Sequence, residues 1–346
     1  DESVAKVAAT SGKTMEELNT QVGKTQTSFG EFEGNLREFA QFMGSNTAFS
    51  ATQAAEALNY MALAGYDAQK SMDMLPTVLD LAAAGGMELA SASDMVTDAQ
   101  SALGLTTDQT TKMVDQMAKA ASKSNTSVSQ LGEAFLTIGA SARNLKGGTT
   151  ELATVLGVLA DNGIKGAEGG THLRNMILSL QNPTKDAAAL MNNLKINLYD
   201  GNGEMRSMID VVQELRDKTA NMDQASRDAI VSGIFNKTDL AAVNALLGTT
   251  DERFAQLYGD IKNADGAAKE MAATQLDNLA GDITLFQSAL EGAKIAVSDG
   301  LTPTLREFVQ FGTESISNLT SAFKEDGLAG AMDALGETIQ KGIGNL

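Results

Sequence analysis

The chain has 346 residues, of which 43% are hydrophobic but only 5% are aromatic, so we expect a globular protein whose cores consist of Ala, Leu, Met and Gly. Lysine and arginine number 26 against 44 acidic residues, a formal net charge of −18 that repels phosphate backbones, and we expect no direct binding to nucleic acid. The absence of cysteine excludes disulfides and thiolate metal sites, and because the sequence opens at Asp1 without a methionine we expect a segment of a longer chain.

Helices are predicted almost throughout, beginning with a helical lead-in over residues 1–48. Three later helices are predicted to start at capping boxes, in which a hydroxyl residue is followed three positions later by glutamine: Ser50 to Gln53, Thr106 to Gln109 and Ser127 to Gln130. Glycines recur at the ends of the apolar-periodic runs, as they do where helices stop. The expected fold class is therefore mainly α, an array of short helices.

Residues 50–103 align without gaps onto residues 127–180, which lie 77 positions further along the chain. The alignment contains 12 identities in 54 positions, among them Leu75 with Leu152, Ala83 with Ala160 and Gly86 with Gly163. We interpret this as a tandem duplication of a helical unit, forming a core over 49–183. The alternative is that both segments only share the residue preferences of Ala-rich helices.

Four glycines lie between Asp161 and Thr171, but they lack Gly-x-Gly-x-x-Gly spacing and no Lys-Ser or Lys-Thr follows them. A phosphate-binding loop is therefore not predicted. We interpret the segment as a structural joint, with one helix ending near Asn162 and the next starting close to Thr171. The sole histidine, His172, has no cysteine or second histidine with which to share a metal, and a packing role is expected. No catalytic, cofactor-binding or metal-binding residue is assigned.

Residues 184–264 are predicted to form a helical subdomain with one small β-hairpin near 195–208. Lys195 to Tyr199 alternate in the manner of a strand, and Asp200 to Gly203 are turn residues. Asp200, Asn202 and Glu204 resemble the first ligands of a calcium loop, but the glycine and the bidentate glutamate of such a loop are missing. A turn is therefore predicted there.

Long amphipathic helices are predicted for residues 265–346. Apolar residues at spacings of three and four form a narrow heptad stripe, which is typical of a coiled-coil seam between copies of a chain: Leu276, Leu279, Ile283, Phe286, Leu290, Ala293 and Val297. The alternative is an amphipathic helix that packs on the preceding domain. A long C-terminal helix with coiled-coil character thus completes the expected fold.

Three stretches, 49–85, 115–135 and 159–183, together resemble the core region of phage tail tape measure proteins, also called the minor tail protein family. Their most specific part is Gly163, Ile164, Lys165 and Gly166, followed by Gly170, Thr171, Leu173 and Arg174. The similarity runs from about Val4 to about Phe323. Where the family has Ala-Gly-Thr-Ala-Leu-Arg, this chain has Gly and His at the two alanine positions, 169 and 172, so the family's packing is not carried over there.

The resemblance implies a structural protein without enzymatic activity that lies in the lumen of the tail tube or at the tail tip of a virion. Such a protein takes part in tail assembly and length determination, is present in the host cytoplasm during assembly, and is released at genome ejection. The implied partners are copies of the chain itself, with a trimer preferred to a hexamer, tail tube and distal tail or hub proteins, and tail assembly chaperones. The alternatives are a channel-forming segment that acts on the host membrane, and a longer chain that carries a wall hydrolase elsewhere.

Overall fold

The computed structural model describes residues 2–27, 29–278 and 280–295, and scattered positions between 317 and 335. The chain divides into two compact units, Asp1–Ala289 and Leu290–Leu346. In the second unit the described residues, 290–295 and the positions between 317 and 335, are helical. The first unit contains everything described below apart from the end of the helix that spans 280–295.

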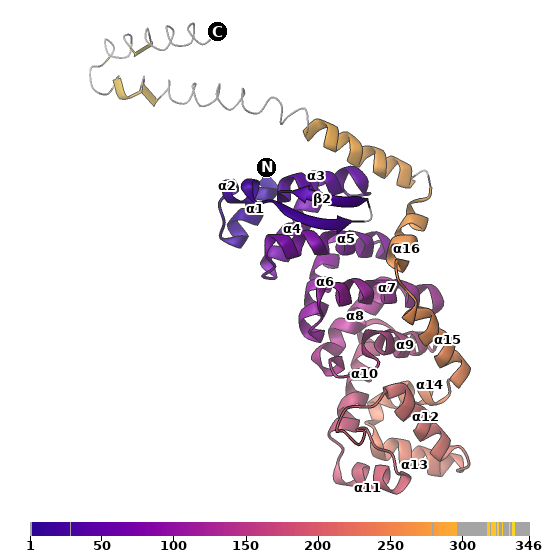
Figure 1. Cartoon of the computed structure of the whole chain (residues 1–346). Helices are drawn as coiled ribbons and strands as arrows, with labels where there is room; N and C mark the ends of the chain where they lie inside the picture. The colour runs from indigo at the N-terminus through magenta and orange to yellow at the C-terminus, as the bar shows by residue number, and fades with distance from the viewer. Residues whose placement is uncertain are drawn as a thin grey trace. The chain divides into compact units, whose positions relative to one another are not determined.

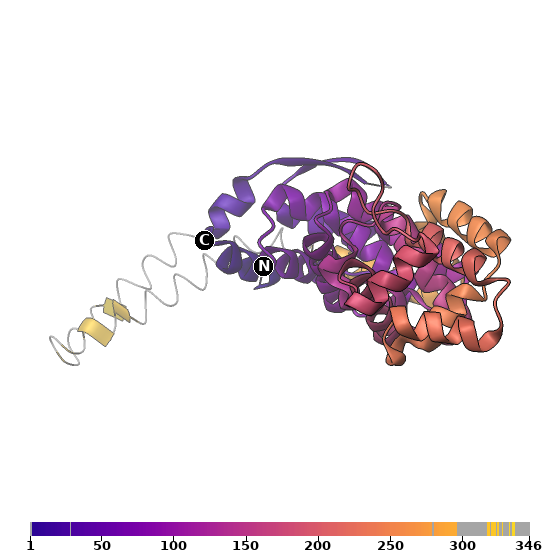
Figure 2. The same ribbon diagram turned by 90° about the horizontal axis from the view of Figure 1, so that it is seen from below.

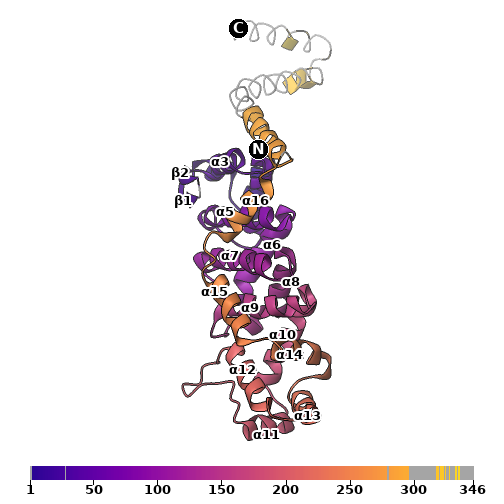
Figure 3. The same cartoon turned by 90° about the vertical axis from the view of Figure 1, so that its right-hand side faces the viewer.

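The first unit opens with α1 (Glu2–Ser11), α2 (Met15–Thr20), the strands β1 (Gly23–Thr27) and β2 (Gly30–Gly34), and α3 (Leu36–Asn46). The strands pair antiparallel, with Gly23 opposite Gly34, and lie along the outside of the helix layers (Figures 2 and 3). β1 packs against α5. The sequence pattern does not reveal this hairpin because Phe32 is its one large apolar residue, too few to give an alternating pattern. Phe32 instead contacts the rings of Phe39 and Phe42 on α3.

A succession of helices follows, in layers that keep the chain order (Figure 1). They are α4 (Ala51–Leu63), α5 (Ala68–Gly85), α6 (Leu89–Leu103), α7 (Thr107–Lys123), α8 (Val128–Ile138), η1 (Gly139–Ala142), α9 (Gly148–Asp161), α10 (Gly166–Gln181), α11 (Lys185–Leu194), α12 (Met208–Thr219), α13 (Gln224–Ile234), η2 (Lys237–Asp239), α14 (Leu240–Leu247), α15 (Asp251–Lys262) and α16 (Ala267–Leu276). The predicted fold class, mainly α with one small hairpin, is confirmed. None of the described helices is long and apolar enough to cross a lipid bilayer.

The three predicted capping boxes are all present. Ser50, Thr106 and Ser127 are the N-caps of α4, α7 and α8, and each side chain accepts a hydrogen bond from the backbone amide of the glutamine three residues later. Each glutamine side chain in turn accepts a hydrogen bond from the backbone amide of its cap residue. At each of these helix starts, two backbone N–H groups that have no acceptor within the helix therefore find one in a nearby side chain.

The helices repeat at the predicted spacing. α4 and α6 begin at Ala51 and Leu89, and α8 and α10 begin 77 residues later, at Val128 and Gly166. α5 and α9 also end alike: Gly86 and Gly163 both have positive φ, and the next amide donates back to the carbonyl of Ala82 in one case and Leu159 in the other. α4 to α7 and α8 to α11 thus form two copies of one helical arrangement.

The last helices of the unit return along one side of these layers (Figures 1 and 3). α15 packs on α7 and α9, and α16 packs on α5 and α7. α5 and α9 are counterparts, so the corresponding helix of each repeat is covered by a returning helix, while α7 contacts both returning helices. The core between these layers contains mostly Ala, Leu, Val and Met, of which Ala, Leu and Met were predicted from the composition and Val was not.

Between α11 and α12 the predicted hairpin near 195–208 is reduced to a turn with a single antiparallel bridge, from Tyr199 to Met205. Ile196, Leu198 and Met205 are buried, so this segment packs onto the helices instead of extending as paired strands. The carboxylate of Asp200 accepts hydrogen bonds from the amides of Asn202 and Glu204, which lower the pKa of Asp200 and use its oxygens within the turn. The paired strands of the described chain are therefore β1 and β2.

Candidate functional site

The glycine-rich segment forms a short turn and then enters a helix. α9 ends at Asp161 with Asn162 as C-cap, as predicted. Gly163 has a φ of 86°, which favours glycine, and the amide of Ile164 donates to the carbonyl of Leu159 at 3.0 Å. Lys165 is the extended N-cap residue of α10. The turn that joins the two helices therefore covers only residues 162–165.

The predicted start of the next helix close to Thr171 is wrong, because α10 already begins at Gly166. Gly170 consequently lies inside the helix, where it meets α8. A Cβ atom at Gly170 would lie 2.5 Å from the carbonyl oxygen of Ala134 and 2.9 Å from its Cα. Glycine in a helix interior costs about 1 kcal/mol relative to alanine. Here the close approach of α10 to α8 requires it, and this requirement cannot be read from local sequence.

The remaining motif residues attach α10 to its surroundings. Leu173 is buried in the core, and the Nη1 of Arg174 donates to the carbonyl of Thr137 on α8 at 3.3 Å. The hydroxyl of Thr171 donates to the carbonyl of Ala167 one turn earlier. Gly170, Leu173 and Arg174 therefore specify the crossing of α10 with α8.

His172, on the same helix, belongs to a buried polar cluster that the sequence did not reveal. Its Nδ1 lies 2.8 Å from Oδ1 of Asp239, a fully buried carboxylate at the junction of η2 and α14. The side-chain amides of Asn175 and Asn236 donate to the same carboxylate at 3.1 and 3.3 Å. A buried charge costs little free energy only when it is paired and hydrogen-bonded, as Asp239 is. The cluster joins α10 to residues more than sixty positions later, and no local pattern signals that contact.

A second buried carboxylate was also missed. Glu151 on α9 is 1% exposed and accepts hydrogen bonds from the hydroxyl of Ser207 at 2.7 Å, the amide of Ile209 at 3.1 Å and the amide of Gly147 at 2.9 Å. Ser207 is the N-cap of α12. Glu151 thereby fixes the start of α12 to the second repeat.

These two carboxylates hold helices together, and each of their oxygens has at least one hydrogen-bond partner within the chain. Among the residues that the structure describes, no group of three or more His, Asp or Glu side chains could hold a metal ion. In these two clusters the buried carboxylates are satisfied by hydrogen bonds within the chain.

Comparison with known proteins identifies the family of this chain. A family model described as "Phage-related minor tail protein" matches residues 37–236, more than half of the chain, and this range contains both helical repeats and the motif around Gly170. The chain belongs to the phage-related minor tail protein family. The resemblance seen in the sequence is thus confirmed.

Two curated relatives of this minor tail protein share most of its length. A tape measure protein of Pneumococcus phage Dp-1 is 34% identical over 305 residues, which is 87% of this chain and 26% of the relative. A probable tape measure protein of Escherichia phage P2 is 26% identical over 287 residues, which is 82% of this chain and 35% of the relative. The chain therefore spans about a quarter to a third of the length of these relatives. No solved structure matches it.

The returning helix α16 of this minor tail protein is attached through acidic side chains. Asp115 on α7 accepts hydrogen bonds from the amides of Gly266 and Ala268, at 2.9 and 3.0 Å, and so caps the start of α16. Burial, together with the nearby Asp115 carboxylate, raises the pKa of Asp80 on α5 to about 6. The side-chain amide of Gln275 donates to the carbonyl of Ala84 at 2.6 Å. α16 therefore docks on α5 and α7 through polar groups at both of its ends.

The predicted seam does not lie on one continuous helix. α16 ends at Leu276, and the side chain of Asn278 accepts a hydrogen bond from the amide of Gly281 at 3.1 Å, so a new helix starts and continues over 280–295. The interruption is a capping interaction that a count of apolar spacings cannot show. Leu279 and Val297 lie outside the described residues.

The seam residues that remain on the second helix are exposed. Ile283 is 49% exposed, Phe286 69% and Leu290 44%, and Ala293 is exposed as well. Elsewhere on this helix Ser288 is buried, and its hydroxyl donates to the carbonyl of Ala48 at 3.1 Å. Within the first unit, Ser288 thus holds this helix against Ala48, while the side chains of Ile283 and Phe286 remain exposed.

Proposed function

We propose that this chain is a structural segment of a tape measure protein in the tail of a phage or phage-like particle. The observation that carries the proposal is that both helical repeats and the Gly170 crossing fall within the family match, and that the similarity to a tape measure protein extends over most of the chain. The buried carboxylates of Asp239 and Glu151 are both used in helix contacts, which suits a structural role. By this proposal the segment lies in the tail tube lumen or at the tail tip, acts in assembly, and leaves at ejection.

The folded-back repeats argue against this segment as the measuring part of the longer protein. A helix rises about 1.5 Å per residue only while it stays extended, and the longest helix labelled in the described chain, α5, has 18 residues. Successive helices run back and forth and stack in layers. Each residue therefore adds less to the length of the segment than it would in one extended helix. We assign the segment to a compact domain that contacts other tail proteins and place the length-setting part elsewhere in the chain.

Removing one whole repeat, residues 51–127, from the full-length protein tests this assignment. Loss of the α4 to α7 layer exposes the buried faces of α3 and α8, so we expect particles without tails. Electron micrographs of the particles provide the measurement. Normal-looking tails that are shorter by about 115 Å, which is 77 residues at the helix rise, would show instead that the repeat is part of the ruler.

Self-association is the second element of the proposal. Exposed large apolar side chains at heptad spacing are typical of helices that pack against copies of themselves, and a trimer is preferred to a hexamer. Replacing Ile283 and Phe286 by aspartate places two charges on this face. We expect the oligomer to dissociate, as measured by light scattering after gel filtration.

The matched control carries the same two charges on the same helix, at Thr284 and Gln287, which are already exposed and polar. It should keep the mass of the unchanged protein. An equal mass for all three proteins would contradict the proposed seam, and a stable mass other than threefold would contradict the trimer.

A membrane-acting role at ejection remains the alternative. The formal net charge of −18 opposes binding to anionic lipids, and this disfavours the role. Leakage of dye from anionic vesicles on addition of the purified segment would support that alternative against the structural one.

A further inference from the structure

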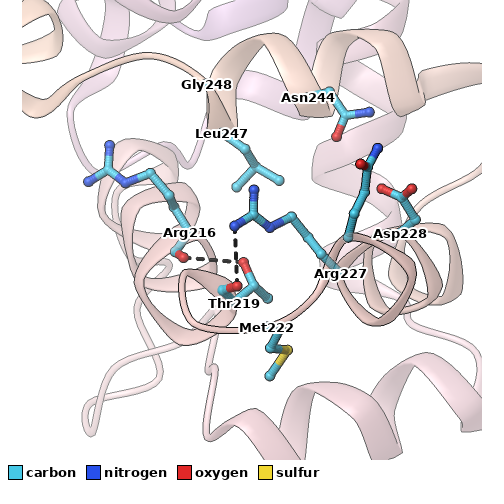
Figure 4. A pocket seen from close by; sticks show the side chains of 9 residues that line it. Arg216, Thr219, Met222, Arg227, Asp228, Asn244, Leu247 and Gly248 are labelled. Atoms are coloured by element: carbon cyan, nitrogen blue, oxygen red, sulfur yellow. Dashed lines mark hydrogen bonds between the residues drawn. The ribbon is translucent and has the colours of Figure 1, made fainter.

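A pocket of about 480 Å³ lies between α12, α13 and α14, outside the motif and the seam. Its walls combine charged, amide and apolar side chains, shown in Figure 4: Arg216, Thr219, Met222, Gln224, Arg227, Asp228, Asn244, Leu247 and Gly248. None of these residues takes part in the buried carboxylate clusters described above. The pocket therefore needs its own explanation.

Arg227 is the central feature of the pocket. It projects from α13 across the pocket toward Thr219 and Leu247 (Figure 4). Its guanidinium makes one hydrogen bond within the described chain, from Nη2 to the carbonyl of Thr219, at a long 3.4 Å. Its Nε is buried without any partner. A guanidinium has five N–H donors, so most of the hydrogen-bonding capacity of Arg227 is unused.

The neighbouring arginine shows what a satisfied guanidinium looks like in the same wall. Arg216 lies 2.6 Å from a carboxylate oxygen of Asp251 and donates to the carbonyl of Thr249 at 2.8 Å. In the part of the chain that the structure describes, no carboxylate lies within ion-pair distance of Arg227. With 44 acidic residues against 26 basic ones, a partly buried cation without a carboxylate is unexpected in this chain.

The other residues that line the pocket limit the kind of ligand that it can bind. Asp228 also lines the pocket but is not within ion-pair distance of Arg227, whose guanidinium extends toward Leu247 and Thr219 (Figure 4). Arg216 is already neutralised by Asp251, so one unpaired cation and one carboxylate remain in the pocket. A phosphate dianion would need more positive charge than this. A monoanion on a methylene chain fits better, since Met222 and Leu247 provide apolar contacts.

We propose that this pocket binds the carboxylate of a glutamate or aspartate side chain on a partner protein, with the two Nη groups of Arg227 as the donors. Gln224 and Asn244 also line the pocket, and their side-chain amides supply hydrogen-bond donors and acceptors for the peptide backbone that carries this carboxylate. Bidentate pairing of guanidinium with carboxylate is among the strongest charge-assisted hydrogen bonds in proteins. This assignment does not rest on the role of the chain in tails.

The test uses the whole chain with its 16 methionines labelled at the methyl carbon, because Met222 reports on this pocket and its signal is assigned by a Met222→Leu variant. N-acetylglutamate N-methylamide is titrated to about 50 mM at constant ionic strength, a range suited to the millimolar affinity expected of one ion pair. We expect a saturable shift of the Met222 signal. The corresponding glutamine derivative, which has the same shape without the charge, should leave that signal unmoved.

Two variants complete the design. Arg227→Gln should weaken the apparent affinity about tenfold or more. Arg253→Gln removes the same charge from a half-buried ion pair with Asp161, outside the pocket, and should leave the affinity unchanged. Equal shifts with the glutamate and glutamine derivatives, no shift of Met222 in the unchanged protein, or saturation with inorganic phosphate alone would each overturn the proposal. The derivative comparison on the unchanged protein remains decisive even if Arg227→Gln does not fold.

Discussion

The two helical repeats share their order, caps and stops but differ at the positions where helices meet. Gly170, at the crossing of α10 with α8, corresponds to Ser93 of α6, which is fully buried and donates its hydroxyl to the carbonyl of Leu89. A side chain is therefore accommodated in the first repeat, whereas the backbone of Ala134 occupies its place in the second. The caps and glycine stops that begin and end the helices are shared by both repeats. Single residues at the helix crossings decide how closely the helices pack within each repeat.

The returning helices meet the repeats at a second pair of corresponding positions. Asp80 lies under α16 in the first repeat, and its counterpart Gly157 lies on α9, which α15 covers. A Cβ at Gly157 would lie 2.6 Å from Oγ of Ser124 and 3.0 Å from Cδ2 of Leu257. Both returning helices are also held by polar contacts, α16 through Asp115 and α15 through Arg253, which pairs with Asp161. The two copies therefore differ at this position in close packing, which Gly157 allows under α15.

Substitution of Gly170 by alanine should give the largest effect. The added Cβ would meet the backbone carbonyl of Ala134, which cannot move aside as a side chain would. We expect a loss of about 3 kcal/mol in the free energy of unfolding, measured by urea denaturation. Ser93→Ala in the first repeat should cost about 1 kcal/mol, for the lost hydrogen bond. A smaller loss for Gly170→Ala than for Ser93→Ala would show that the second crossing is not the tighter one.

Glu151 gives the next largest effect, because its counterpart in the first repeat is the buried Met74. Glu151→Met makes the second repeat resemble the first but leaves the donors of Gly147, Ser207 and Ile209 without their acceptor. We expect a loss of about 2 kcal/mol and faster hydrogen exchange at the start of α12. The control, Met74→Leu, should cost less than about 1.5 kcal/mol. Equal losses would mean that Glu151 contributes only its volume.

Asp80→Asn should stabilise the protein, and the effect depends on pH. Burial raises the pKa of Asp80 from 3.8 to about 6, so the folded protein holds this proton more tightly than the unfolded chain does. The stabilising contribution of the protonated group is therefore complete below the unfolded value and lost as the pH rises through about 6. At neutral pH we expect Asp80→Asn to raise the free energy of unfolding by about 1 to 2 kcal/mol.

The difference between Asp80→Asn and the unchanged protein should shrink as the pH falls below about 6 and vanish only well below the unfolded value of 3.8, where the group is protonated in both states. Asp73→Asn, an acidic residue on the same helix that already accepts a hydrogen bond from Gln69, is the control for removal of one negative charge. Stabilisation that persists unchanged at low pH would point to general charge repulsion instead of burial at α16.

Local sequence was sufficient for the features that depend on a few adjacent residues. The caps at Ser50, Thr106 and Ser127 and the stop at Gly163 were predicted because each involves a side chain or a backbone angle within four positions. The 77-residue spacing was visible for the same reason, since the copies share those signals. Fold class and repeat could therefore be predicted from the sequence.

Features that depend on contacts between residues far apart in the sequence could not be predicted from it. Gly170 looks like a helix breaker until Ala134 is placed beside it, and the partner of His172 lies 67 residues away. The break before the helix at 280–295 depends on the cap at Asn278, which interrupts an otherwise regular apolar spacing. Arg227 was not singled out at all, because an unpaired charge becomes visible only when its surroundings are known.

The smallest expected effect lies where the second repeat departs from the first. α11 ends at Leu194, and Lys195 follows with a φ of 56°, the one positive φ at a residue other than glycine in the described chain. Its counterpart, Ala118, lies within the longer α7. Lys195→Gly should raise the free energy of unfolding by about 0.5 kcal/mol, since glycine adopts this angle without a Cβ clash. Ala118→Gly should lower it by about 1 kcal/mol or more, as measured by thermal denaturation. The two changes in the free energy of unfolding have opposite signs only if the helix of the second repeat ends at Lys195. A loss of stability in both variants would mean that both repeats favour a helix over this stretch.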